Sequence, residues 1–209
     1  MTDRENFLAR YDVSRGTLER LDALVTELER WSRAINLVSP GTLPLVWTRH
    51  VLDSIQLLDV APAKPRIWAD FGSGGGFPGL VCAVAASDRP DFRDTEFHLI
   101  EADARKAAFL AAAARSAGTG LTVHPARAES LAPIGAQVVS ARALAPLPRL
   151  LSIAVRHLAP GGRAVFPKGA GYRDEIAKAL ESRRFTYEKH PSRTDPEAAL
   201  LVIGDIEHA

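Results

Sequence analysis

The fold of this 209-residue chain is decided by one stretch of sequence, Ile67-Trp68-Ala69-Asp70-Phe71-Gly72-Ser73-Gly74-Gly75-Gly76-Phe77-Pro78-Gly79. Its apolar beginning predicts a strand over 67–71, and Pro78 suits the first turn of a helix over 78–86. The glycines between them allow positive φ and let backbone N–H groups approach a ligand without an intervening Cβ. So many glycines between a strand and a helix favour a nucleotide-binding turn over a turn kept for packing alone.

Strand-like and helical patterns continue to alternate after this stretch, which is typical of an α/β fold with a parallel sheet. Further strands are predicted over 97–101, 121–124, 137–141 and 163–167, and a final antiparallel pair over 185–189 and 198–203. The intervening helices are predicted over 104–117, 147–158 and 172–182.

The stretch before the first strand has a helical pattern instead. Apolar residues recur at steps of three and four from Ser14, a candidate N-cap, to about residue 37, and a second helix is predicted over 43–60. We therefore expect a helical N-terminal extension over residues 1–60, packed on a main domain over 61–209.

Composition narrows the class of protein. The chain is 46% hydrophobic and 24% charged with a net charge of +1, as expected of a soluble globular protein, and any nucleic-acid partner would have to meet a local basic patch. Cys82 is the one cysteine, no Cys/His cluster has zinc-ligand spacing, and the N-terminus has no apolar signal segment. We expect a cytoplasmic protein without a metal.

The identity of the nucleotide depends on the residues around the glycines. The spacing Gly74–Gly79 matches a dinucleotide fingerprint, so a nicotinamide-dependent oxidoreductase stays open. Asp70, however, would repel a diphosphate and would suit the ammonium and sulfonium of S-adenosylmethionine. Glu101, at the end of the second strand, can accept hydrogen bonds from the ribose of either cofactor. The remaining cofactor contacts are expected from the glycine turn itself, at Gly72, Ser73, Gly74, Gly76 and Phe77.

Two further sites follow later strands of the predicted sheet. Ala128-Glu129 could lie against an adenine ring, although an ordinary exposed loop fits equally well. Arg142 follows the fourth strand, at the sheet edge where open α/β folds bind ligands, and could contact a carboxylate, a phosphate or a guanine edge. A structural salt bridge is the alternative for Arg142. The chain has no Asn/Asp-Pro-Pro-aromatic tetrad and no catalytic-loop cysteine, which favours an acceptor nucleophile that needs no deprotonation.

Several motifs together resemble those of one family, the bacterial 16S rRNA guanine-N7 methyltransferases called RsmG or GidB (glucose-inhibited division protein B). The similarity covers about residues 15–170 and includes Trp31, Asn36-Leu37, Arg49-His50-Val51-Leu52-Asp53-Ser54, the stretch 70–79, Arg105-Lys106, Phe109-Leu110, Arg127-Ala128-Glu129, Ser140-Ala141-Arg142-Ala143 and Lys168-Gly169. Two departures are Glu101-Ala102, where the family usually has Asp-Ser, and the four-residue Ser140–Ala143 in place of Ser-Arg-Ala.

The resemblance implies a Rossmann-like, seven-stranded class I S-adenosylmethionine-dependent methyltransferase fold with an N-terminal helical extension. It also implies S-adenosylmethionine as the methyl donor and a guanosine of the small-subunit RNA as the acceptor. By the same resemblance, Gly72 and Phe77 contact the cofactor, Ala128 and Glu129 flank its adenine, and Arg142 lines the catalytic site. Because guanine N7 has a free lone pair, catalysis would consist of alignment, with Arg142 orienting the guanine and Asp70 helping to hold the cofactor.

RNA binding requires cations near the predicted site. The candidates are Arg49, His50, Arg105, Lys106, Arg142, Lys168 and Arg173, each of which alone is more often a solvated surface charge. We expect a monomer whose partner is 16S rRNA or the small ribosomal subunit, with no DNA or membrane partner. The rival interpretations are a methyltransferase acting on a small molecule, the oxidoreductase, and a non-enzymatic RNA-binding protein.

Overall fold

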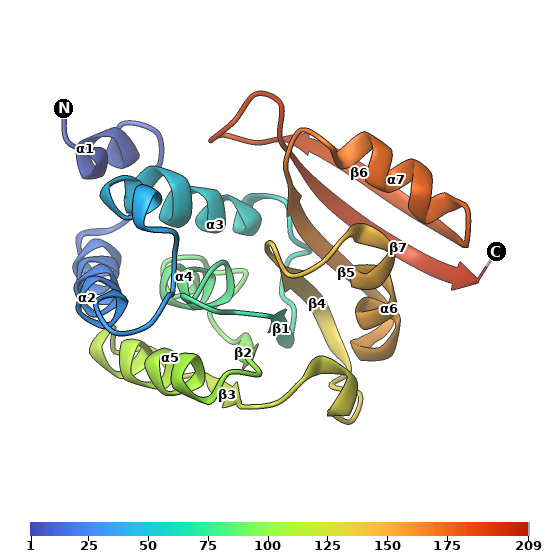
Figure 1. The fold of residues 1–209 in the computed structure, drawn as a ribbon, viewed down its shortest axis with the longest axis horizontal. Helices are drawn as coiled ribbons and strands as arrows, with labels where there is room; N and C mark the ends of the chain where they lie inside the picture. The colour runs from blue at the N-terminus through green and yellow to red at the C-terminus, as the bar shows by residue number, and fades with distance from the viewer. Residues whose placement is uncertain (209) are drawn as a thin grey trace.

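A seven-stranded sheet with the order β3-β2-β1-β4-β5-β7-β6 forms the centre of the protein, in a computed structural model that describes residues 1–208 (Figure 1). The strands are β1 Ile67–Phe71, β2 Glu96–Ile100, β3 Thr122–His124, β4 Ala136–Ala141, β5 Leu158–Lys168, β6 Arg183–Pro191 and β7 Ala199–His208. The first five are parallel, and β7 runs antiparallel to both β5 and β6. The predicted α/β class is confirmed, with β5, β6 and β7 longer than predicted.

Helices cover both faces of the sheet because successive side chains of each strand point to opposite faces. In β1, Trp68 packs into a core with α4 (Gly79–Ala86) and α5 (Ala104–Ser116). Ala69 and Phe71 point the other way, into a core with α6 (Leu147–His157) and α7 (Tyr172–Leu180). The central strands β1 and β4 are therefore buried on both faces, and each carries a buried polar side chain, Asp70 in β1 and Ser140 in β4.

The first 60 residues are helical and share the core of α4 and α5. Helix α1 (Asp3–Leu8) was not predicted individually. Helix α2 (Arg15–Ser32) begins, as predicted, after Ser14, whose side chain accepts from the Thr17 N–H at 3.1 Å. It ends at Ser32 and not near residue 37, so Ile35 reaches the core from a turn.

The helix predicted over 43–60 is not one regular helix. It is a sequence of four short turns: η1 (Pro40–Leu45, 3-10), η2 (Trp47–Leu52, π), α3 (Asp53–Ile55) and η3 (Gln56–Asp59, 3-10). We call this stretch, residues 40–59, the irregular helical segment. Pro44 lacks an N–H group and cannot extend a regular helical ladder, which accounts for the break near the start of the segment.

The strand register places the functional residues next to each other. Phe71 of β1 pairs with Ile100 of β2 on one side and with Ala141 of β4 on the other. The residues that follow these three, Gly72, Glu101 and Arg142, therefore lie together at the carboxyl edge of the sheet. The chain order reverses between β1 and β4, which is where open α/β sheets bind ligands. Among the described residues, no helix is both long and apolar enough to cross a membrane.

Candidate functional site

Two cavities open at this edge and meet at Arg142 and Ala143, which line both. The first, of about 330 Å³, we call the glycine-loop cavity; it is lined by Gly72, Gly74, Ile100, Glu101, Ala102, Lys106, Ala126, Arg127, Ala128, Glu129, Leu144, Arg149 and Ile153 besides the shared pair. The second, of about 310 Å³, we call the hairpin-loop cavity, because part of its wall comes from the loop between β6 and β7. Its other walls come from the irregular helical segment and the end of β5.

A Cβ has no room at Gly72 or at Gly79 of the glycine loop. Gly72 has φ +68°, and a Cβ there would lie 2.7 Å from Leu144 Cδ1. A Cβ on Gly79 would lie 2.5 Å from both Asp70 Cβ and Leu99 Cδ2, so Gly79 lets α4 pack directly on the sheet. The loop thus combines a positive-φ turn that faces the cavity with a close packing contact behind it.

Most N–H groups of the loop are already used inside the protein. Gly72 and Ser73 donate to the Ile100 carbonyl, and Gly74 donates to the Glu101 carboxylate at 2.9 Å. The N–H groups of Gly76 and Phe77 donate to the Ser73 carbonyl. A diphosphate needs free N–H groups aimed at its oxygens. This arrangement therefore disfavours the dinucleotide interpretation.

Glu101 is the acidic side chain of the glycine-loop cavity. Its relative exposure is 9%, and its two carboxylate oxygens accept from the Gly74 and Asp103 N–H groups, each at 2.9 Å. Each oxygen keeps a further acceptor position, so the carboxylate is fixed in place and still able to bind hydroxyl groups. These two hydrogen bonds hold the carboxylate in place although the Glu101 side chain is one methylene longer than the Asp usual in the family.

Ala128 and Glu129 lie on the far wall of the same cavity, in a short 3-10 turn, η4 (Ala128–Ser130). The buried His157 ring fixes this turn, since its Nε2 lies 3.0 Å from the Ala128 carbonyl. Glu129 is exposed and forms an ion pair with Arg149 at 3.0 Å. Both residues predicted to flank an adenine are thus at the cavity, with Ala128 as its flat apolar surface.

Asp70, which the sequence predicts to lie beside the ammonium and sulfonium of the cofactor, is outside both cavities. Its side chain is fully buried beneath α4 and lines neither cavity; Oδ1 accepts from Ser140 Oγ at 2.7 Å and Oδ2 has no hydrogen-bond partner. Burial raises the pKa of Asp70 to about 6, although the Ser140 hydrogen bond opposes this. The structure offers no direct contact between Asp70 and a bound ammonium, because the glycine loop and Gly79 cover it.

Ser73, Gly76 and Phe77 also lie behind the cavity wall. Ser73 is buried and donates from Oγ to the Asp70 carbonyl at 3.0 Å. Phe77 is buried beneath the His50 ring, with ring centroids 4.9 Å apart, and the Arg142 guanidinium lies 5.0 Å from the Phe77 centroid. These residues shape and support the site without lining either cavity.

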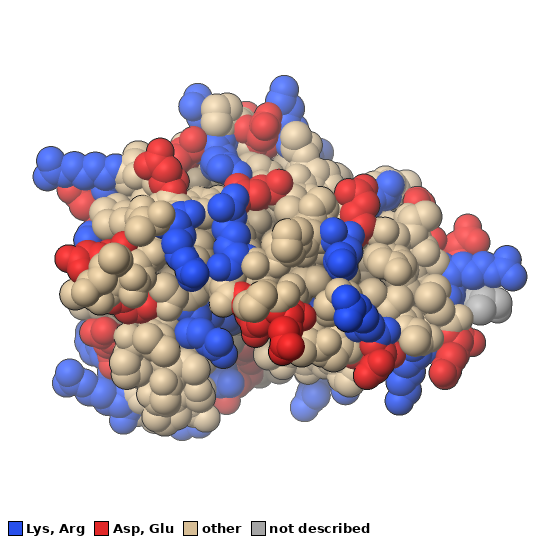
Figure 2. All heavy atoms as spheres, turned by 90° about the horizontal axis from the view of Figure 1, so that it is seen from above, with Lys and Arg blue, Asp and Glu red and all other residues tan. Residues whose placement is uncertain are grey.

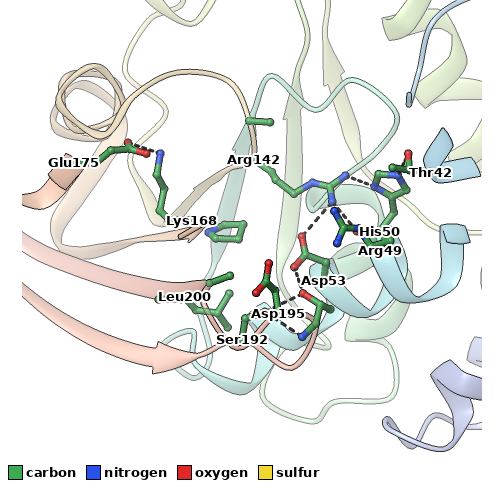
Figure 3. Close-up of a pocket in the computed structure, with 16 residues that line it drawn as sticks. Thr42, Arg49, His50, Asp53, Arg142, Lys168, Glu175, Ser192, Asp195 and Leu200 are labelled. Atoms are coloured by element: carbon green, nitrogen blue, oxygen red, sulfur yellow. Dashed lines mark hydrogen bonds and ion pairs between the residues drawn. The ribbon is translucent and has the colours of Figure 1, made fainter. Parts of the chain in front are cut away.

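Arg142 is held by the irregular helical segment (Figure 3). Its Nη1 donates to Asp53 Oδ2 at 3.1 Å and to the Arg49 carbonyl at 3.2 Å, and its Nη2 lies 2.8 Å from His50 Nδ1. The Arg142 side chain is 18% exposed. Arg142 therefore forms the ion pair of the structural interpretation and also lies between the two cavities, and its contact with a ligand stays a prediction.

The contact with Arg142 fixes the proton on His50. A guanidinium has no acceptor, so His50 Nδ1 must accept, and in the neutral ring Nε2 then carries the hydrogen and donates to Thr42 Oγ1 at 2.9 Å. Burial, together with the charges of Arg142 and Arg49, lowers the pKa of His50 to about 4. His50 is consequently a neutral ring that orients Arg142 and is no phosphate-binding cation at neutral pH.

The other predicted RNA-binding cations differ in their surroundings. Arg49 and Lys106 line one cavity each and form no ion pair among the described residues. Lys168 lines the hairpin-loop cavity but is paired with Glu175 at 2.6 Å. Arg105 is exposed at the start of α5, and Arg173 lies over the Tyr172 ring away from both cavities. Figure 2 shows Lys and Arg interspersed with Asp and Glu over the face seen from above, in keeping with the net charge of +1.

Sequence reasoning missed several residues of the site. Asp53 and Arg127 were quoted only within motifs, Asp53 without its role as the partner of Arg142 and Arg127 without its place in the glycine-loop cavity beside Lys106. The loop between β6 and β7 contributes Ser192, Thr194 and Asp195 to the hairpin-loop cavity. Nothing in the local sequence marks that loop, because only the antiparallel return of β7 beside β5 brings it to the site.

Known proteins share much of this sequence. The family model described as "GidB: rRNA small subunit methyltransferase G" matches residues 17–196. Proteins named "Ribosomal RNA small subunit methyltransferase G" are similar over nearly the whole chain. One from Cereibacter sphaeroides is 48% identical and covers 98% of each chain, and one from Rhodospirillum centenum is 48% identical and covers 96% of this chain and 90% of its own.

Solved structures share the fold at low sequence identity. A ribosomal protein L11 methylase from Lactobacillus delbrueckii has a TM-score of 0.57 and 18% identity, covering 72% of this chain and 75% of its own. A mutant of MtNAS, determined in complex with S-adenosylmethionine, has a TM-score of 0.53 and 14% identity, covering 96% of this chain and 75% of its own. The predicted class I methyltransferase fold is thereby confirmed.

Proposed function

Because this chain belongs to the GidB family of rRNA small subunit methyltransferases, we propose that it transfers a methyl group from S-adenosylmethionine to N7 of a guanosine in 16S rRNA. The observation that carries the proposal is the pair of cavities that meet at Arg142. One cavity suits a nucleoside cofactor and the other lies beside it, where an acceptor base can reach the transferred methyl group.

The residues of the glycine-loop cavity fit the cofactor. Glu101 would accept hydrogen bonds from the ribose hydroxyls, and Ala128 would lie against the adenine. The backbone at Gly72 and Gly74 would contact the methionine part of the cofactor. When bound, S-adenosylmethionine supplies an electrophilic methyl group on a positively charged sulfur. Asp70 would act indirectly, because its buried carboxylate lies behind the loop that makes these contacts.

The protein's part in methyl transfer would be alignment and not proton removal. Guanine N7 is a lone-pair nucleophile, so the rate depends on holding it in line with the methyl group in a site without competing water. Arg142 lies between the two cavities and is fixed by Asp53 and His50. Its planar donors suit O6 of guanine or an adjoining phosphate and leave the N7 lone pair free.

The test uses purified enzyme with small subunits and, separately, with free 16S rRNA, in the presence of radiolabelled donor. We expect one N7-methylguanosine, identified by mass spectrometry of RNA fragments. Arg142→Ala should lower kcat by about a hundredfold or more, as expected for a group that fixes reactant geometry, and leave cofactor affinity by calorimetry unchanged. Arg163→Ala, on the opposite part of β5 and away from both cavities, is the matched control.

The outcome also separates the alternatives. Methylation of small molecules without RNA turnover would favour the small-molecule methyltransferase, and binding of RNA without any turnover would favour a non-enzymatic role. We further propose that the enzyme works as a monomer in the cytoplasm on RNA and not on DNA. Sedimentation of the active enzyme and an assay with DNA of the same sequence test these points.

A further inference from the structure

The hairpin-loop cavity contains one carboxylate that no cation neutralises. Asp195 is half-buried, and Figure 3 shows its carboxylate pointing into the space between Arg142, Lys168 and Leu200. Oδ1 accepts from the Glu197 N–H at 2.9 Å. Over residues 1–208, Asp195 forms no ion pair. By contrast, the other two carboxylates of the cavity, Asp53 and Glu175, are paired with Arg142 and Lys168.

The loop that carries Asp195 is fixed by the irregular helical segment. Gln56, with 1% exposure, accepts from the Arg193 N–H at 2.8 Å and donates from Nε2 to Ser192 Oγ at 3.3 Å. Thr194 Oγ1 donates to Asp53 Oδ1 at 2.9 Å. Asp53 therefore holds Arg142 with one oxygen and the Asp195 loop with the other. This arrangement fixes the distance between Arg142 and Asp195 before any ligand binds, as a preorganised site requires.

The two ends of the cavity match the two edges of guanine. Arg142 presents donors, which suit O6 and leave the N7 lone pair free for the methyl group, whereas Asp195 presents acceptors, which suit N1–H and the N2 amino group on the Watson–Crick edge. Adenine has an acceptor at N1 and no N2 amino group, so it would leave the Asp195 carboxylate unpaired. Leu200 and Pro167 supply apolar walls between these ends.

We propose that Asp195 reads the N1–H and N2 edge of the acceptor guanine and thereby turns N7 toward the glycine-loop cavity. The proposal rests on the function proposed above and assigns the specificity for guanine to a loop outside the strands that hold the cofactor. Because Asp195 would occupy the Watson–Crick edge, the target guanosine has to be unpaired when it is methylated, as is usual for enzymes that modify bases.

The test compares guanosine with inosine, which lacks only the N2 amino group, at the target position of a site-specifically substituted RNA. The wild-type enzyme should lose on the order of tenfold to a hundredfold in kcat/KM with inosine, the range expected for one hydrogen bond to a charged group. Asp195→Ala should lose a larger factor with guanosine, because it removes the contacts to both N1–H and N2, and it should lose nothing further when inosine replaces guanosine. Glu197→Gln is the control, because it removes a carboxylate from the same loop but contacts Asp195 only through its backbone.

The results distinguish this inference from the proposed function. If the wild-type enzyme methylates N7 and Asp195→Ala keeps the full preference for guanosine over inosine, the inference is wrong and the function stands. If the wild-type enzyme transfers no methyl group to RNA at all, the proposed function fails first. Unchanged cofactor affinity by calorimetry in Asp195→Ala establishes that the variant is folded, and Asp195→Asn provides a second, nearly isosteric variant.

Discussion

At the scale of single residues, Asp70 is a buried charge that supports the site from behind. Trp68 Nε1 donates to Ser140 Oγ at 2.8 Å, and Ser140 donates in turn to Asp70 Oδ1. This series of hydrogen bonds links β1 to β4 directly below Gly72 and Arg142. One carboxylate oxygen has no partner, so ionising Asp70 in the folded protein costs free energy.

Replacing Asp70 by Asn should reveal that cost as a pH dependence. The folded-state pKa of about 6 exceeds the unfolded value, so the native state binds more protons and wild-type stability falls as pH rises from about 4 to 6. The free energy of unfolding of wild type should therefore drop relative to Asp70→Asn by roughly 2 kcal/mol across this range. Urea unfolding at several pH values measures it.

A control with the opposite sign is available for that experiment. Partial burial raises the pKa of Asp88, but hydrogen bonds from Ser14 lower it by more, so the pKa lies below its usual value. The difference in free energy of unfolding between Asp88→Asn and wild type should therefore vary with pH below about pH 4 and stay constant between pH 4 and 6. Parallel stability curves for wild type and Asp70→Asn would contradict a raised pKa at Asp70.

At the scale of elements, the irregular helical segment holds Arg142 and the loop between β6 and β7 in place. Its π-helical turn presents His50 to Arg142 and its next turn presents Asp53, while Gln56 holds the loop between β6 and β7. The N-terminal segment thus organises a site whose other residues come from the strands of the sheet.

Removing the His50 ring should misplace Arg142. Loss of one hydrogen bond to a charged group is worth about 1.5–3 kcal/mol, so His50→Ala should lower kcat about tenfold to a hundredfold. His50→Asn keeps an acceptor near the position of Nδ1 and should recover part of the rate. Steady-state methyl transfer measures both variants, and cofactor calorimetry should show no change. Equal rates for His50→Ala and wild type would remove His50 from the positioning of Arg142.

The elements also show which features the sequence could predict. Strand β1 and the turn after it were predictable because an apolar run and glycines are local signals, and Glu101 and Arg142 followed from their positions just after strands. The burial of Asp70 was not predictable, since it depends on α4 lying at Gly79 directly over the sheet. Asp195 could not be found either, because 53 residues of sequence separate it from Arg142 and only the fold of β7 brings them together.

At the scale of the whole molecule, an overall charge of +1 means that RNA must be held by a few local cations. The structure narrows these to side chains at the carboxyl edge of the sheet that lack a carboxylate partner among residues 1–208. They are Arg49, Lys106 and Arg127 at the cavities, with Arg105 nearby at the start of α5. Lys168 and Arg142 are already neutralised by Glu175 and Asp53, so they add little to long-range attraction.

The salt dependence of RNA binding tests this distribution of charge. Each phosphate contact releases counterions, so the logarithm of the association constant should fall linearly with the logarithm of salt concentration, and Lys106→Gln should reduce the slope by about 0.7–0.9. Arg115→Gln removes a cation from the other end of α5, and the slope should stay unchanged because that end lies about 13 to 14 Å from Lys106 along the helix axis. Fluorescence anisotropy with a labelled RNA fragment at several salt concentrations gives both slopes. Equal slopes for Lys106→Gln and Arg115→Gln would mean that RNA is held elsewhere on the surface, since only contacts at the carboxyl edge distinguish the two ends of this helix.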